Sequence, residues 1–484
     1  MLLLLGLLAL QAVARILNAP AFVWNEIRMA RSVGLLYGVP LYPDRNASTP
    51  IVGTMHTPVS HCLYLAVAAL RSPTQLLLAG SLLSLLLMFV PLAWVLWRAS
   101  DGAFERILAA GVAFLFCGFS IMEAPGTFHL ASMIHVDAAV VAFATIACGI
   151  FSNPRRPVTS AQVWICGLAC AFAVGSKQTA APIVLGVAVF IAVIAGRRML
   201  AHFCAAVLMG GAILFAIILL FVPLEAFLFN TVTLAAHRPL KPDYADVLVR
   251  AFREEKQDAA PALFTIVLIT GVQWMMRGRP HSPRKFFAAN RWLAFAIPAA
   301  MLLPVTVKGF ASVGADVNHP GLILYLLFVA AGLAVIEGID DREHAVVRAV
   351  AWMCASLGIL MGIAPGVLPA LPLRLHHYGM NAAETALAYE RRHPGRAWFP
   401  CNPLAHLLAS GRAVHVDYSV YDREIGGFPL SPRQFETGLP PGFELVAIPP
   451  GEGLQSAASH EMLQHFERSS DTELPGWEVY RRLP

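Results

Sequence analysis

Long uncharged apolar runs, separated by short polar segments, dominate the chain from its first residue to about residue 373. An apolar run of about 20 residues, with a lower limit near 17, can cross the hydrocarbon core of a bilayer as a helix. Suitable runs lie near 1–18, 73–97, 107–122, 138–154, 157–176, 178–196, 199–224, 259–276, 292–307, 317–336 and 349–373. The pattern predicts an all-α polytopic membrane bundle of about 11 transmembrane helices.

The segment 59–70 is also apolar, but it is short and follows Pro58. If it were counted as a span, every later loop would be assigned to the other side of the membrane. If it lies in the interface instead, basic residues such as Arg98 and Arg155 fall on the side of the N-terminus, as the positive-inside rule requires. We therefore expect a cytoplasmic N-terminus and interfacial helices in a first outer loop, 19–72.

The composition changes after residue 373, where Pro, Gly, Glu and Arg become frequent and no span-length run occurs. Apolar pieces such as AVHVDYSV alternate with turn signals, which favours a small α/β domain. The predicted topology places this domain outside the cytoplasm. The expected organisation is a transmembrane domain, 1–373, followed by a periplasmic C-terminal domain, 374–484.

The composition supports a membrane protein and excludes several other classes. Charged residues make up 13% of the chain and the mean hydropathy is +0.64, whereas soluble domains carry about 25% charged residues. The net charge of +5 is too small and scattered to indicate nucleic acid. No Walker motif, GxGxxG, zinc spacing or GxSxG elbow is present, so we expect the lipid bilayer as a partner and no nucleotide site.

The polar stretch Trp24–Leu63 holds two candidate catalytic carboxylates. Asn25 is expected to cap a helix that ends near Tyr37, which places Glu26 in the first turn at the membrane surface. A carboxylate there could accept a proton from an attacking hydroxyl group, or it could simply favour the helix N-terminus. Asp44 is the second candidate, although its YPDRNAS context is typical of a turn.

Four polar clusters are expected at the outer ends of spans, facing one mouth of the bundle. Lysines beside acid-poor loops suit a phosphate, although they could also snorkel to the interface, and ionisable residues at a span edge are candidates for function or for polar caps. The clusters are His135 with Asp137, Lys177 with Gln178, Lys308 with Asn318 and His319, and Arg238 in a Pro-rich loop. Lys177, Lys308 and Arg238 are the predicted phosphate-binding residues.

The order of several segments resembles the GT-C class of membrane glycosyltransferases, in particular bacterial relatives of protein O-mannosyltransferases and of the lipid A aminoarabinose transferase. The segments are NEIRMARSVGLLYGVPLYPD, HTPVSHCLYLAVAAL, IHVDAAVVAFATIACGIF, GSKQTAAPIVLGVAVFI and KGFASVGADVNHPGLILYLL. His56 begins the second segment, where many relatives have Tyr-Pro-Pro-Leu-Tyr. The resemblance covers roughly residues 1–340.

The resemblance implies an inverting glycosyltransferase that moves a sugar from a polyprenyl-phosphate donor to a hydroxyl acceptor at the periplasmic face of a bacterial inner membrane. It places Glu26 at the base position, next to Asn25 where relatives often carry another acid, with Asp44 as the fallback. Lys177 and Lys308 would contact the lipid phosphate. The substrate cavity would be lined by His56, His135, Asp137, Gln178, Asn318 and His319.

Several points stay open at the level of sequence. The acceptor could be a glycan, a lipid or a protein, and the sugar is not identified. No cofactor is assigned; a divalent metal is an open alternative, although no carboxylate cage supports it. The competing functions are a transporter or flippase of a lipid-linked saccharide and a non-catalytic protein of cell-envelope assembly.

Overall fold

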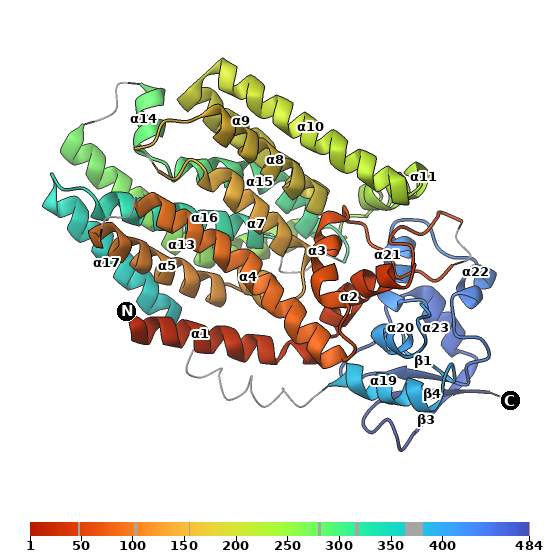
Figure 1. Ribbon diagram of the computed structural model, residues 1–484. Coiled ribbons are helices and arrows are strands. Elements are labelled where there is room, and N and C mark those ends of the chain that lie inside the picture. Colours follow the sequence, from red (N-terminus) through yellow and green to blue (C-terminus); the bar gives the residue numbers. More distant parts are fainter. Residues whose placement is uncertain are drawn as a thin grey trace.

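The protein is a helical bundle with a mixed α/β unit at one end, as Figure 1 shows. The computed structural model describes residues 1–483 except 47–48, 101–103, 154, 279–281, 315–318 and 364–380. Residues 381–483 form the C-terminal unit. We call the end of the bundle that carries this unit the mouth; the N-terminus lies at the opposite end (Figure 1).

Among the described residues, nine helical segments are long and apolar enough to cross a membrane. Uncharged sequences form helices there because a helix satisfies all its backbone hydrogen bonds internally. The segments are α1 (Leu2–Leu17) extended by η1 (Ala19–Ala21), α4 (Pro73–Ser100), α5 (Phe104–Glu123), η2 (Gln178–Ala180) with α9 (Ala181–Ala195), α10 (Arg197–Phe221), the Gln257–Arg277 part of α13 (Tyr244–Arg277), α15 (Leu293–Ala311), α16 (Gly321–Ile339) and α17 (Ala345–Ile363). The predicted multi-span helical bundle is confirmed.

Two of the eleven predicted spans are not among the nine segments found in the described residues. Run 138–154 corresponds to α7 (Val136–Gly149), which meets α6 (Pro125–Ser132) at an angle of 100° and counts as a tenth span only with it. Run 157–176 corresponds to α8 (Ser160–Ser176), whose 17 residues are slightly short of span length. Both helices are packed inside the bundle, where neighbouring helices, and not lipid alone, cover them.

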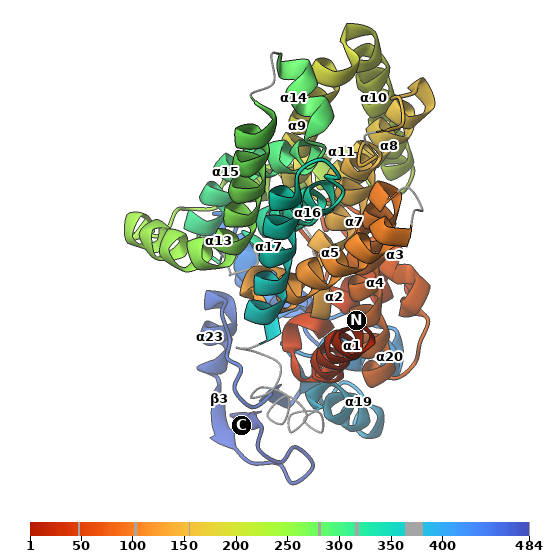
Figure 2. The same cartoon turned by 90° about the vertical axis from the view of Figure 1, so that its left-hand side faces the viewer.

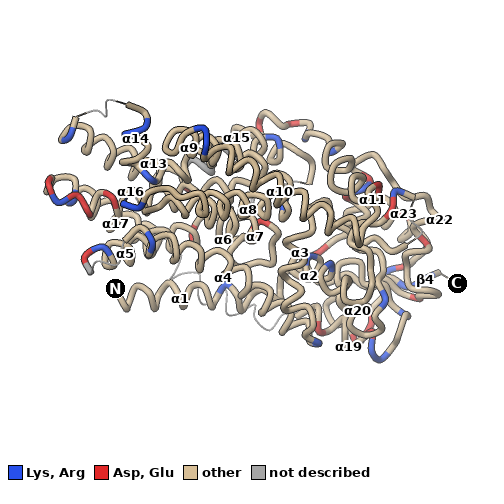
Figure 3. Tube along the Cα trace, turned by 45° about the horizontal axis from the view of Figure 1, so that its top comes forward, with Lys and Arg blue, Asp and Glu red and all other residues tan. Residues whose placement is uncertain are grey.

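The charges of the described residues gather at the two ends of the bundle (Figure 3). At the end remote from the mouth, Asp340 accepts hydrogen bonds from Arg106 at 2.7 Å and from Arg155 at 2.8 Å. These ion pairs join α5, α16 and the segment between α7 and α8. Apolar helix surface lies between the two charged ends, as expected for a protein that spans a bilayer.

Short helices cover the mouth. They are α2 (Val23–Leu36), α3 (Val59–Ala68), α11 (Leu224–Leu228), the π-helical turn η3 (Phe229–Thr233) and α12 (Leu234–Ala236), while α14 (Pro283–Ala289) lies at the opposite end (Figures 1 and 2). The predicted cap of α2 was wrong, because Phe22 and not Asn25 precedes the helix. The Asn25 side chain is instead buried, and its Oδ1 accepts a hydrogen bond from the backbone N–H of Ile134.

The C-terminal unit contains a four-stranded sheet in the order β1-β2-β4-β3. Strands β1 (Ala397–Trp398) and β2 (Leu445–Ile448) are parallel, and β4 (Glu478–Arg482) is antiparallel to both β2 and β3 (Phe466–Ser469). The helices of the unit are α19 (Ala382–Arg392), α20 (Leu404–Ser410), α21 (Asp417–Ile425), α22 (Pro432–Thr437) and α23 (Ala457–Leu463). The predicted small α/β region is confirmed.

The C-terminal unit is fixed directly to the bundle. Glu384 at the start of α19 accepts hydrogen bonds from the side chains of Ser72 and Thr74, at the start of α4. The N–H of Val416 donates to the carbonyl of Ile51 in the first loop at 3.1 Å. These contacts hold α20 and α21 against the mouth, so the unit forms part of any site there.

Glycine allows two helices beside the mouth to pack at backbone distance. A Cβ added at Gly186 of α9 would lie 2.6 Å from the Cα of Pro298 in α15, so only glycine fits this crossing. Close backbone approach through small residues is a common basis of helix association in membranes.

We expect Gly186→Ala to lower stability by about 1–3 kcal/mol, the usual cost of overpacking. Gly271→Ala in α13 is the matched control, because an added Cβ there meets nothing within 4 Å. Thermal denaturation of both variants in detergent measures the difference. Equal midpoints for the two variants would show that the crossing of α9 and α15 is not tightly packed.

Candidate active site

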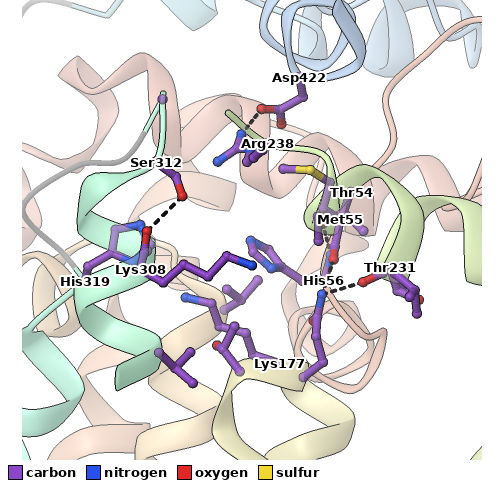
Figure 4. A pocket seen from close by; sticks show the side chains of 18 of the residues that line it. Thr54, Met55, His56, Lys177, Thr231, Arg238, Lys308, Ser312, His319 and Asp422 are labelled. Carbon is purple, nitrogen blue, oxygen red and sulfur yellow. Dashed lines mark hydrogen bonds and ion pairs between the residues drawn. The ribbon is translucent and has the colours of Figure 1, made fainter. Parts of the chain in front are cut away.

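A cavity of about 1370 Å³ opens at the mouth, between the bundle and the C-terminal unit. Its walls come from α2, the first loop, the junction of α8 and α9, the end of α15, the segment from η3 to Arg238, and α21. Figure 4 shows His56, Lys177, Lys308 and Arg238 converging on it from these separate elements. A large concave site with a few convergent polar groups is the usual form of a substrate pocket.

One face of α2 forms a wall of the cavity. Trp24, Ile27, Arg28 and Arg31 line it, and their i, i+3, i+4, i+7 spacing places them on one side of a helix. Arg28 donates a hydrogen bond to the carbonyl of Ile134 at 3.1 Å. Neither arginine is among the residues predicted from the sequence, although the helical spacing from Trp24 onwards could have revealed them.

Arg31 is a buried cation that forms no ion pair with a carboxylate among the described residues, although the charge of Asp422 acts on it. The residue is 8% exposed. Among the residues that the structure describes, its only hydrogen bond is to the Thr54 hydroxyl at 3.5 Å, and its Nε has no partner. Burial lowers the pKa of Arg31. A buried guanidinium is costly unless paired, so this arrangement favours binding of an anion.

Lys308 supplies a second cation from the last turns of α15. Among the described residues, no hydrogen bond or ion pair engages its ammonium group, which points into the cavity in Figure 4. His319, after α15, lines the same cavity. Asn318, predicted beside it, lies outside the described residues.

Lys177 and Asp137 form an ion pair on the floor of the site. The Lys177 ammonium lies 2.7 Å from Asp137 Oδ1, and His135 Nδ1 lies 3.3 Å from Asp137 Oδ2. Lys177 and His135 line the main cavity, whereas Asp137 lines a small adjoining one. Lys177 is therefore held in place by a carboxylate, unlike Lys308.

Gln178 and His56 complete the floor. The Gln178 amide donates to the carbonyls of Met55 at 2.7 Å and Thr231 at 2.9 Å, which joins three separate segments. Burial and the nearby Lys177 and Arg31 charges lower the pKa of His56 well below its ordinary value. The imidazole of His56 is thus neutral at neutral pH and adds no charge.

The roof of the cavity comes from the C-terminal unit. Asp422 of α21 forms an ion pair with Arg238, and both residues line the cavity together with Tyr418 and Tyr421. The rings of Trp24 and Tyr418 meet edge to face at 4.1 Å. No sequence signal could connect α21 with α2, because the contact depends on how the C-terminal unit docks.

The structure places Glu26 outside the cavity lining. Glu26 is 1% exposed, and its carboxylate accepts hydrogen bonds from the Asn402 side chain at 2.8 Å and from the Leu404 N–H at 3.1 Å. Burial raises its pKa to about 8. A base must reach the proton that it accepts; here the carboxylate instead faces the start of α20, on the side of α2 away from Arg31.

Asp44 also lies outside the cavity lining. Asp44 is exposed to solvent, and its backbone carbonyl accepts a hydrogen bond from Arg423 at 3.3 Å. The described residues contain no group of three or more His, Cys, Asp or Glu side chains that could hold a metal ion.

Comparison with known proteins identifies the fold. No family model matches the chain, and no curated protein matches its sequence. The crystal structure of ArnT from Cupriavidus metallidurans bound to undecaprenyl phosphate is similar over 99% of this chain and 98% of that one, with a TM-score of 0.55 and 12% identity. This chain has the fold of GT-C glycosyltransferases.

A second ArnT structure gives the same architecture. ArnT in the apo state matches over 95% of this chain and 93% of that one, with a TM-score of 0.51 and 13% identity. The archaeal oligosaccharyltransferase AglB from Archaeoglobus fulgidus covers 92% of this chain, with 69% of its own length matched, a TM-score of 0.46 and 12% identity. The GT-C fold predicted from the order of the segments is confirmed; the roles of individual residues have to be argued from the site itself.

The burial of Glu26 predicts a pH-dependent stability. Because its folded pKa is raised from 4.5 to about 8, its protonated form stabilises the protein, and that contribution is lost as the pH rises from about 5 to 9. Glu26→Gln should therefore gain thermal stability relative to the wild type over this range.

Glu436→Gln, at an exposed position, is the control and should show no such trend. The measurement is the unfolding midpoint of each protein between pH 5 and 9. A constant difference between Glu26→Gln and wild type at every pH would contradict the assigned environment of Glu26.

Proposed function

We propose that this protein is an integral-membrane glycosyltransferase that moves a sugar from a polyprenyl-phosphate donor to a hydroxyl acceptor at its mouth. The observation that carries the proposal is the pair of cations, Arg31 and Lys308, that line one cavity without a carboxylate partner among the described residues. A phosphodiester is the anion that such a donor would bring to them.

The phosphate of the donor would bind between Arg31 and Lys308. A guanidinium presents a planar fork of donors that suits phosphate oxygens, and an ammonium acts as a compact charge. Charge-assisted hydrogen bonds of this kind are roughly twice as strong as neutral ones. Lys177, held by Asp137, adds positive potential from the floor.

The polyprenyl chain would lie against an apolar part of the same cavity. Leu185 of α9 and Val232 of η3 line it and are 62% and 55% exposed; Val305 of α15 lines it too. Exposed apolar side chains beside the cavity suit a lipid tail, which would remain in the membrane while its phosphate reaches the cations.

The proposed sugar transfer needs few catalytic groups. The acceptor hydroxyl attacks the anomeric carbon, the bond from that carbon to the phosphate oxygen breaks, and polyprenyl phosphate leaves with the electron pair. Fixed cations stabilise the charge that develops on the leaving phosphate. A single displacement of this kind inverts the anomeric centre.

We infer that Glu26 serves in this scheme as a link between α2 and α20, because both its oxygens are engaged there. The proposed setting is a bacterial inner membrane with the mouth on the periplasmic side. The basic residues at the opposite end, including Arg106 and Arg155, support that orientation through the positive-inside rule.

Lys308→Met should reduce the affinity for undecaprenyl phosphate by roughly 10–100-fold, the equivalent of one lost charged hydrogen bond. Lys285→Met is the matched control, since Lys285 is exposed on α14 at the opposite end of the bundle. Native mass spectrometry or lipid-dependent thermal stabilisation of the purified protein measures binding. Equal affinity in both variants would contradict the assigned phosphate site.

Release of undecaprenyl phosphate from undecaprenyl-phosphate hexoses separates this function from its rivals. A transferase releases the lipid phosphate in an acceptor-dependent reaction, with Arg31→Gln strongly impaired. A flippase instead moves the intact donor across vesicles, and an assembly protein does neither. Movement of intact donor without release would overturn the proposal.

A further inference from the structure

Three residues of the C-terminal unit present a common face to the cavity. Tyr418, Tyr421 and Asp422 of α21 all line it, and their i, i+3, i+4 spacing places them on one side of the helix. None of these three side chains is a cation, and none is assigned to the donor phosphate. The cavity therefore has a second wall of different chemistry.

The position of α21 is fixed from both ends. At its start, Asp417 accepts a hydrogen bond from the Ser456 hydroxyl at 2.7 Å, and near its end Glu424 accepts from the Ala457 N–H at 2.7 Å. Ser419 donates to the carbonyl of Gly53 in the first loop at 3.4 Å. The face that α21 presents is thus preorganised, as a binding wall requires.

The two walls differ in charge. Arg31 and Lys308 belong to the bundle, whereas the described residues that the C-terminal unit contributes to the cavity are phenols, an amide and a carboxylate, with no cation. The charge of Arg238, which is also at this wall, is balanced by Asp422. This wall therefore offers an acceptor no net positive charge, so it favours a neutral, hydroxyl-rich molecule over an anionic one.

Aromatic side chains on the same wall are a second feature that indicates the class of acceptor. Tyr418 packs edge to face against Trp24, and the Tyr418 and Tyr421 rings lie 5.9 Å apart at a 47° angle. Such rings offer large, rigid, amphipathic surfaces. The apolar C–H face of a sugar ring packs on them, while neighbouring carboxylate and amide groups hydrogen-bond its hydroxyls.

One carboxylate oxygen of Asp422 can accept a further hydrogen bond. Its Oδ1 pairs with Arg238, and no described residue donates a hydrogen bond to its Oδ2. Asp422 is 7% exposed, and burial raises its pKa against the opposing effects of Arg238 and Arg31. A raised pKa strengthens a carboxylate as a proton acceptor.

We propose that the face of α21 is the acceptor subsite, that the acceptor is a neutral saccharide stacked on Tyr421, and that Asp422 is the general base. This inference rests on the proposed glycosyl transfer. As the acceptor oxygen bonds to the anomeric carbon, its proton passes to Asp422 Oδ2, and the electron pair of the broken bond leaves with the polyprenyl phosphate. No further reactant is needed.

The first test measures which acceptor binds. Purified protein with saturating undecaprenyl phosphate is titrated with triacetylchitotriose, maltotriose and mannotriose, with glucose 6-phosphate, and with a Ser-containing hexapeptide. At least one neutral saccharide should bind, Tyr421→Ala should weaken it at least ~10-fold, and Tyr421→Phe should retain most of the affinity. Binding of only the phosphosugar or the peptide, or equal binding by both Tyr421 variants, would overturn the assigned acceptor class.

The second test concerns the base. Asp422→Asn should lower the rate of sugar transfer at least ~100-fold, the usual range for loss of a general base, and should leave undecaprenyl phosphate binding unchanged. The acid limb of the pH–rate profile should disappear with it. The charged or titratable groups that face Asp422 are Arg238, Arg31 and Tyr418, and none of these replaces it as a base near neutral pH.

Asp243→Asn is the matched control, because Asp243 has a 54% exposed side chain in a surface ion pair; its transfer rate should equal that of the wild type. Full transfer by Asp422→Asn, or loss of lipid binding in it, would reject Asp422 as the base. Failure of the wild type to bind undecaprenyl phosphate would instead reject the proposed function itself, so the two failures are distinguishable.

Discussion

The cavity depends on a buried positive charge at the level of the mouth. Within the described part of the chain, the buried Arg31 guanidinium has only a long hydrogen bond to Thr54, and a buried cation is destabilising without an anion beside it. Lys308 approaches the same cavity from α15. The fold therefore keeps two cations, neither of them in an ion pair with a described carboxylate, next to an apolar wall of the cavity, a combination that suits a lipid phosphate.

The C-terminal unit completes the site instead of merely following the bundle. Glu384 and Glu26 anchor it to α4 and α2, and this docking positions α21 over the cavity. The cationic donor wall of the bundle and the aromatic and acidic wall of the unit then line one cavity. The proposed transfer needs both: one wall stabilises the leaving phosphate and the other orients the attacking hydroxyl.

The sequence predicted the bundle because hydropathy alone specifies which segments can cross lipid. It also predicted that Lys177, Lys308 and Arg238 gather at the mouth, because their positions follow from the same topology. The contacts of Glu26 could not be predicted in this way. Local pattern indicates a helix, but which of its faces meets α20 depends on a unit nearly 400 residues away in the chain. The same holds for Asp422, whose position over the cavity has no local signal.

The most direct test of this account is an experimental structure of the protein with undecaprenyl phosphate bound. Phosphate oxygens should lie at charge-assisted hydrogen-bond distance, about 2.7–2.9 Å, from the Arg31 guanidinium and the Lys308 ammonium, with the lipid tail against the apolar residues Leu185, Val232 and Val305. A phosphate bound elsewhere, with Arg31 and Lys308 not in contact with it, would contradict it.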